Sequence, residues 1–282
     1  MLKKSKRHHK NNKYDKYEHD LKLIELLNTQ AQAIKIYLIA DIFFYYFAEA
    51  ELQSAYVEYY GGESDNYYEN IFLIKGSYLS LLASLIISNV SFIAYDLNTK
   101  NNKGIIDYSK EGDKEIITAS VYTVMLFYIN SIGATALYYR ENLCKAEIDD
   151  GWLEISKIQL TSYIIRFFAD YLTLSETLEG IELIKSKYSN VKIDYRNVQN
   201  PDSTAIMAAI LYLIQRIMLF FVNFRVYAYM YDACVQIADI NYLLPNEMPI
   251  LGSTFGIIAD TFALDGFIKI YRRNIDKPVF GR

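Results

Sequence analysis

The chain has 282 residues, of which 52% are hydrophobic and 22% are charged, so it can bury a substantial core. A formal net charge of -4 argues against a generally basic nucleic-acid-binding protein. Only two cysteines are present, Cys144 and Cys234, and they indicate neither a disulfide framework nor a zinc site, so a reducing compartment is expected.

Residues 1–19 hold the basic segment MLKKSKRHHKNNKYDK and all three histidines of the chain. We predict a flexible, solvated tail here, and the alternative is a segment attracted to anionic lipid headgroups. No cysteine or carboxylate pattern completes a metal site around His8 and His9.

The remaining sequence predicts an all-α fold of about six long helices in antiparallel hairpins that form a bundle. All four prolines lie beyond residue 200, and no alternation typical of strands is sustained. We place the helices at 20–60, 68–99, 113–146, 152–188, 203–243 and 253–272. The segment 191–202 is the best linker, so residues 20–190 form a front bundle of about four helices. Residues 203–275 form a back segment of about two helices, either separate from the front or one continuous domain with it.

The first of these helices carries an aspartate, Asp41, within the apolar stretch IYLIADIFFYYFAEA. Apolar residues spaced alternately three and four apart define a heptad seam, and Asp41 falls on it. The seam runs through Ile24, Leu27, Ala31, Ile34, Leu38, Asp41, Tyr45, Ala48, Leu52, Ala55 and Tyr59. Because residues 36–47 are apolar on the other faces too, we expect protein or lipid around this part of the helix.

Two uncharged windows favour a membrane, since residues 76–95 and 116–139 span 20 and 24 positions and about 20 residues cross a bilayer as a helix. We place six spans near 32–52, 76–95, 116–139, 160–180, 203–224 and 249–271. The segments on the side of the N-terminus then hold 20 Lys and Arg residues and the opposite segments hold 5. This asymmetry predicts that both termini are cytoplasmic.

Charged residues within these spans keep a second environment open. Asp41, Asp170 and Arg216, for example, would each cost about 2.5 to 3.5 kcal/mol at the centre of a lipid-exposed helix. They must be sheltered or paired. The alternative location is therefore the cytoplasm, with the chain folded as a soluble, elongated helical bundle.

The triplet around Asp41 recurs three times. An apolar residue and an alanine precede Asp41, Asp170, Asp239 and Asp260 alike. Gln30 precedes Asp41 by eleven positions and Gln159 precedes Asp170 by eleven, so QAQAIKIYLIAD and QLTSYIIRFFAD resemble corresponding helices of two degenerate repeats.

These aspartates and nearby arginines are the residues for which we predict a role. Arg166 lies four positions before Asp170 on the same helical face, and we expect Asp41 to pair with another helix through Arg216 or Arg225. Either the pairs are structural contacts that set helix register, or they line a proton or cation path. The set comprises Asp41, Asp170, Asp239, Asp260, Arg166 and Arg216.

No phosphate-binding loop, dinucleotide motif or metalloprotease helix is present, and LGSTFG at 251–256 is interpreted as a helix start with Ser253 or Thr254 as N-cap. We therefore expect no enzymatic activity, catalytic residue, cofactor or metal.

The favoured function is a structural or protein-interaction role in a membrane, with the bilayer or further copies of the chain as partners. The second hypothesis is a small proton or cation transporter or channel that uses the repeated aspartates, and the third is a soluble self-assembling coat or scaffold protein. No nucleic-acid partner is expected, and no small-molecule substrate is identified.

Overall fold

The computed structural model describes residues 2–64, 67–100, 108–139, 146–186, 188, 201–235 and 244–271, with side chains in the first helix from Tyr17 onward. These residues form six helices and no strand, which confirms the all-α prediction. The helices are α1 (Leu2–Tyr59), α2 (Tyr67–Lys100), α3 (Tyr108–Tyr138), α4 (Asp150–Ser186), α5 (Pro201–Val235) and α6 (Leu244–Tyr271).

The starts of α1 and α6 differ most from the prediction. Helix α1 continues back to Leu2 through the residues predicted as a tail. Helix α6 begins at Leu244, so Pro249 lies inside it and neither Ser253 nor Thr254 is its N-cap. Pro249 is the sixth residue of α6 and has no N–H to donate to the carbonyl of Pro245 four residues earlier, so the helix lacks one backbone hydrogen bond there.

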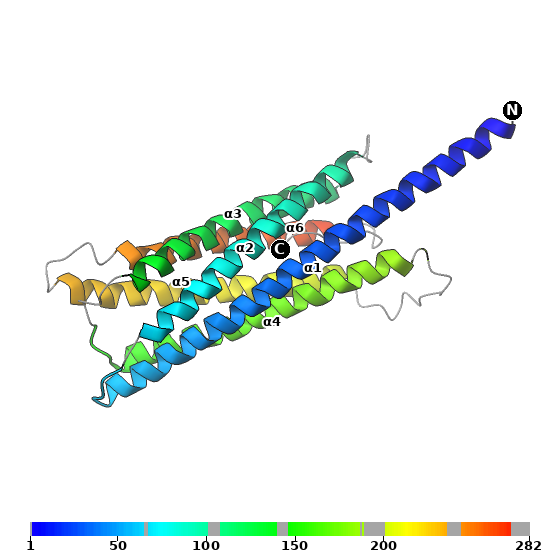
Figure 1. Ribbon diagram of the computed structural model, residues 1–282. Coiled ribbons are helices and arrows are strands. Elements are labelled where there is room, and N and C mark those ends of the chain that lie inside the picture. The colour runs from blue at the N-terminus through cyan, green and yellow to red at the C-terminus, as the bar shows by residue number, and fades with distance from the viewer. Residues whose placement is uncertain are drawn as a thin grey trace.

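The six helices form a closed ring. Each helix packs against two others in the cyclic order α1, α2, α3, α6, α5, α4, and α4 closes the ring against α1. The helices run roughly along one common direction, and the N-terminal part of α1 extends past the others (Figure 1). Helix α5 therefore packs against α4, and α6 packs against α3, in addition to the contact between α5 and α6.

The order of the ring is the same for both halves of the chain. Exchanging α1, α2 and α3 for α4, α5 and α6 leaves every helix pair of the ring unchanged. Helices α1 and α4 carry the two segments that resemble each other, and they occupy corresponding places. The two helices are antiparallel, because Tyr59 bonds Asp150 at one end while Tyr188 bonds Asp20 at the other. This is the arrangement of an inverted repeat.

The outer surface of the ring is apolar. On α5, every third or fourth residue is a large apolar side chain that is between 39% and 55% exposed: Met207, Ile210, Ile214, Ile217, Phe221 and Phe224. The opposite face of the same helix buries Tyr212, Gln215 and Arg216. Helix α4 repeats this polarity, with Phe168 exposed while Ala169 and Asp170 are buried. Large exposed apolar side chains on the same helices as buried charges are unusual in a water-soluble bundle.

Five helices are long and apolar enough to cross a membrane: those covering Tyr17–Tyr59, Asn70–Leu97, Glu111–Tyr138, Ser203–Cys234 and Pro245–Ile270. Their composition suggests a membrane location. Helix α4, predicted as a span, is not among them. Its buried face carries Arg166, Asp170 and Glu176, which lower its mean hydropathy although they point into the bundle.

Cys234, near the end of α5, is disulfide-bonded, contrary to the expectation of two reduced thiols. It is buried. The other cysteine of the sequence, Cys144, lies outside the described residues.

Candidate functional site

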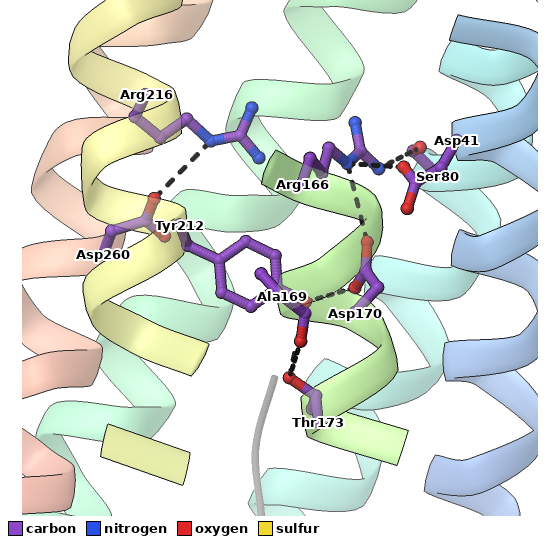
Figure 2. Close-up of polar contacts among 9 residues, drawn as sticks. All are labelled: Asp41, Ser80, Arg166, Ala169, Asp170, Thr173, Tyr212, Arg216 and Asp260. Carbon is purple, nitrogen blue, oxygen red and sulfur yellow. Dashed lines mark hydrogen bonds and ion pairs between the residues drawn. The ribbon is translucent and has the colours of Figure 1, made fainter. Parts of the chain in front are cut away.

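A cluster of charged side chains lies at the middle of the ring (Figure 2). The Nε atom of Arg166 on α4 is 2.8 Å from Oδ1 of Asp41 on α1 and 3.6 Å from Oδ2 of Asp170, one turn further along α4. Its Nη2 atom donates to the Ser80 hydroxyl of α2 at 2.9 Å. One guanidinium therefore joins three helices and holds two carboxylates.

Aromatic rings surround the same guanidinium. Its central carbon lies 4.8 Å from the centroid of Phe44, 5.0 Å from that of Phe127 and 5.7 Å from that of Tyr37. Phe44 also stacks on Tyr163 at 5.1 Å between ring centroids. A desolvated cation over several ring faces is attracted by each of them, so this packing fixes the Arg166 side chain.

A second arginine occupies the other side of the cluster. The Nε atom of Arg216 on α5 lies 3.6 Å from Oδ2 of Asp260 on α6, and both side chains are almost completely buried. Between the two arginines, the Tyr212 hydroxyl of α5 donates a hydrogen bond to Oδ1 of Asp170 (Figure 2).

The ring of Phe127 on α3 connects the two arginines. The Arg216 guanidinium lies 5.4 Å from its centroid, while Arg166 approaches the same ring. With Asp41, Ser80 and Asp260, every helix of the ring supplies a side chain to one charged centre. This centre contains three carboxylates and two guanidiniums, and its members are Asp41, Ser80, Phe127, Arg166, Asp170, Tyr212, Arg216 and Asp260.

Five of the six residues singled out in the sequence meet here, namely Asp41, Asp170, Asp260, Arg166 and Arg216. The sixth, Asp239, lies outside the described residues. The partner of Asp41 is Arg166, not Arg216 or Arg225 as expected. The sequence did not single out Ser80, Phe127 or Tyr212, because an uncharged residue in an apolar helix gives no indication of its contacts.

A cavity of about 260 Å³ begins at the charged centre and extends toward the end of the ring where α1, α3 and α5 finish. All six helices line it, and Arg166 and Arg216 are at its inner end. Its walls combine apolar side chains such as Phe47, Leu219 and Met230 with polar ones. The cavity is a solute-sized space with two buried arginines at its base.

The opposite half of the ring is packed. Leu27, Val90 and Ile184 form part of one buried cluster there, while Ile116, Ala209 and Phe267 belong to another. A void lined by Tyr37, Ile116 and Ala263 measures only about 10 Å³, which is space for a single water. The cavity is therefore open toward one end of the bundle and closed toward the other.

Residues at the start of α4 form part of the mouth of the cavity. Oδ1 of Asp149 accepts hydrogen bonds from the Trp152 N–H and the Tyr229 hydroxyl, each at 2.8 Å. Asp149 is thus the N-cap of α4. The hydrogen bond from the Trp152 N–H, with that from Tyr229, lowers the pKa of the Asp149 carboxyl. Trp152 packs edge-on against Tyr229 and lines the cavity.

No group of three or more histidine, cysteine, aspartate or glutamate side chains that could hold a metal occurs within the described part of the chain. Comparison of the sequence with protein-family models and with curated proteins, and of the chain with solved structures, gives no match.

Proposed function

We propose that this protein is a membrane transporter that moves a small solute together with a proton. The observation that carries the proposal is the cavity lined by all six helices, which is open at one end and terminates at buried charges. The proposal adopts the second of the hypotheses drawn from the sequence in place of a purely structural role, because a register-setting contact needs no cavity beside it.

The surroundings of the helices support a bilayer. Large apolar side chains project outward from the middle of α5 and α4, while the ionisable residues point inward and pair with one another. Charged residues inside a membrane protein face its interior and mark solute or proton pathways. A soluble coat or scaffold protein would expose the polar residues and bury the apolar ones.

The charge balance of the centre supports a proton. If every group is ionised, three carboxylates face two guanidiniums, and one negative charge stays uncompensated in a site shielded from water. Asp41 and Asp170 both pair with the single Nε atom of Arg166, so one proton shared by these two carboxylates neutralises the excess. The ionisable groups around this pair include Tyr37 on α1, Tyr163 and Arg166 on α4, Tyr212 and Arg216 on α5, and Asp260 on α6.

The repeat supports alternating access. In transporters built from inverted repeats, the binding site lies midway across the membrane where the repeats meet, and the two halves exchange conformations to open the opposite side. Here the charged centre lies where α1 contacts α4, and the cavity is open on one side of it.

Two independent features support an orientation. The count of basic residues favours a cytoplasmic N-terminal side, and Cys234 with its disulfide lies at the other end of the ring. Disulfides persist on the oxidising side of a membrane. We therefore propose that the cavity opens away from the cytoplasm and that both termini are cytoplasmic.

Two experiments test this function. The protein should stay with membranes after alkaline carbonate extraction, and recovery in the soluble fraction without detergent contradicts the bilayer. In the second experiment, proteoliposomes with an imposed proton gradient and an internal pH dye are given alanine, glucose, choline or gluconate, each of which represents a different class of solute. We expect one of the four to accelerate proton entry.

Matched variants identify the groups that carry the proton. Asp41→Asn and Asp170→Asn keep the shape and the hydrogen-bonding capacity of the side chain, so both should fold and lose the coupled proton flux. Asp265→Asn, the same change at a half-exposed site on α6, should keep it. If the two central variants retain the flux, the proton does not use this pair.

A further inference from the structure

We infer that the cavity binds an organic carboxylate, held by the two terminal nitrogens of Arg216. The inference rests on the proposed function and names the chemical class of its solute. It follows from a difference between the two arginines at the base of the cavity.

The guanidinium of Arg166 is already used by the protein. It contacts Asp41, Asp170 and Ser80, and aromatic rings cover its faces. Of its two terminal nitrogens, Nη2 donates to Ser80 and only Nη1 has no acceptor among the described residues, so a ligand that binds both terminal nitrogens would compete with Ser80. Arg166 therefore forms part of the scaffold of the site.

The guanidinium of Arg216 is only partly used. Its Nε atom faces Asp260 at 3.6 Å, and no described residue accepts a hydrogen bond from its terminal nitrogens. Those nitrogens point away from Asp260 in Figure 2. The residue is 4% exposed and lines the cavity. A buried cation with two unused parallel donors is suited to bind a carboxylate through both of its oxygens.

A second unused donor lies along the same cavity. Ser77 of α2 is 1% exposed, and its hydroxyl has no hydrogen-bond partner among the described residues. Buried hydroxyls are nearly always hydrogen-bonded, and a bound anion or water would supply the missing partner. Two different helices thus present unused donors to one space.

The walls of the cavity favour an organic anion over an inorganic one. Phe44, Phe47 and Tyr163 line it on one side, and Leu219, Val226 and Met230 line it on another. These surfaces would strip water from phosphate or sulfate without replacing it, whereas they bury the hydrocarbon part of a carboxylic acid. A monocarboxylate that arrives with one proton also leaves the total charge of the centre unchanged.

The test is calorimetric binding of three matched probes to the purified wild-type protein in detergent. Benzoate carries the carboxylate, benzamide is a neutral analogue of the same shape, and benzylamine is a cation. We expect benzoate to bind about tenfold or more tightly than benzamide, because only a carboxylate satisfies both donors. Equal affinity for benzoate and benzamide, or tighter binding of benzylamine, overturns the inference.

The matched variants are Arg216→Lys and Arg225→Lys. Arg216→Lys keeps the positive charge next to Asp260 but removes the planar pair of donors, so benzoate affinity should fall about tenfold or more. Arg225 lies on the same helix, is exposed and does not line the cavity, so Arg225→Lys should bind benzoate like the wild type. If Arg216→Lys also binds like the wild type, Arg216 is not the site.

The outcomes separate this inference from the proposed transport. If glucose or choline moves together with protons but benzoate does not bind, the proposed transport is supported and the inference of a carboxylate ligand is wrong. Benzoate binding that depends on Arg216, without proton flux in liposomes, supports the site and contradicts the transport.

Discussion

Arg166 and Arg216 lie on the same phenylalanine ring, but the protein holds them in different ways. Arg166 joins α1, α2 and α4 through Asp41, Ser80 and Asp170. Arg216 has one longer ion pair, with Asp260. Two buried arginines in one cluster need not share a role, because the contacts that each guanidinium already makes decide how much of it a ligand could still use.

Removing Arg166 should have the largest effect on stability. Arg166→Met leaves Asp41 and Asp170 buried without a cation, and breaking such an ion pair costs about 3 to 5 kcal/mol. We expect little folded protein in size-exclusion chromatography and a large drop in thermal stability. Arg216→Met should lose less stability, because it removes the cation partner of only one carboxylate.

A rescue variant checks the physical reason. Combining Arg166→Met with Asp41→Asn and Asp170→Asn removes the uncompensated charges, so much of the lost stability should return. If the triple variant is as unstable as Arg166→Met, aromatic packing around Arg166 and not charge pairing holds the centre together.

Gly266→Ala should have the next largest effect, and it acts away from both arginines. An added Cβ at Gly266 would lie 2.9 Å from the carbonyl oxygen of Gly112, and the reverse contact is 2.8 Å. Backbone atoms cannot move aside as a side chain can, so α3 and α6 must separate at a cost of about 1 to 3 kcal/mol. Thermal unfolding in detergent measures this loss of stability, and an unchanged stability would contradict the close approach of α3 and α6.

Gly256→Ala is the counterpart next to Arg216. The added Cβ would lie 2.7 Å from Cδ of Arg216, which belongs to a flexible side chain. We expect nearly unchanged thermal stability but weaker benzoate binding, because the guanidinium must shift. Equal losses of stability in Gly256→Ala and Gly266→Ala would contradict the difference expected between the close contact of α3 with α6 and the site next to Arg216.

Asp149 provides the smallest expected effect and a pH dependence independent of the centre. Folding lowers the pKa of this carboxyl through the Trp152 N–H. The ionised N-cap therefore stabilises α4 above the ordinary carboxyl pKa, and this contribution is lost as the pH falls through the lowered value. Asp149→Asn keeps a capping oxygen, so it should cost less than about 1 kcal/mol and flatten this acid-side dependence of thermal unfolding. An unaltered pH profile would contradict it.

The sequence predicts the helices and singles out three aspartates that meet in the charged centre, but it predicts the inward face of α1 only in part. Leu27, Ile34 and Asp41 of the expected seam are buried. Leu38 and Tyr45, also expected there, are not buried, and Tyr37 and Phe44 face inward in their place. Because residues 36–47 are apolar on every face, hydrophobicity did not distinguish Tyr37 from Leu38 or Phe44 from Tyr45.

The pairing of Asp41 could not be predicted for a different reason. Its partner lies 125 positions away on α4, and two helices, α2 and α3, lie between them in chain order. Arg166 has a nearer carboxylate four residues along its own helix, which suffices to explain it locally. Only the closure of α4 against α1 brings Asp41 to the same atom.

The length of α1 has a mechanical consequence. With 58 residues it is about 87 Å long, far more than the roughly 30 Å of a bilayer core. It bonds the start of α4 through Tyr59 and packs through Tyr17 on Tyr188, just after the end of α4. Beyond Tyr17 it continues to Leu2 past the other helices (Figure 1). A small rotation between α1 and α4 at the charged centre would displace that tip by a much larger distance. A fluorophore attached near Leu2 would therefore report such a rotation as a large displacement of the helix end.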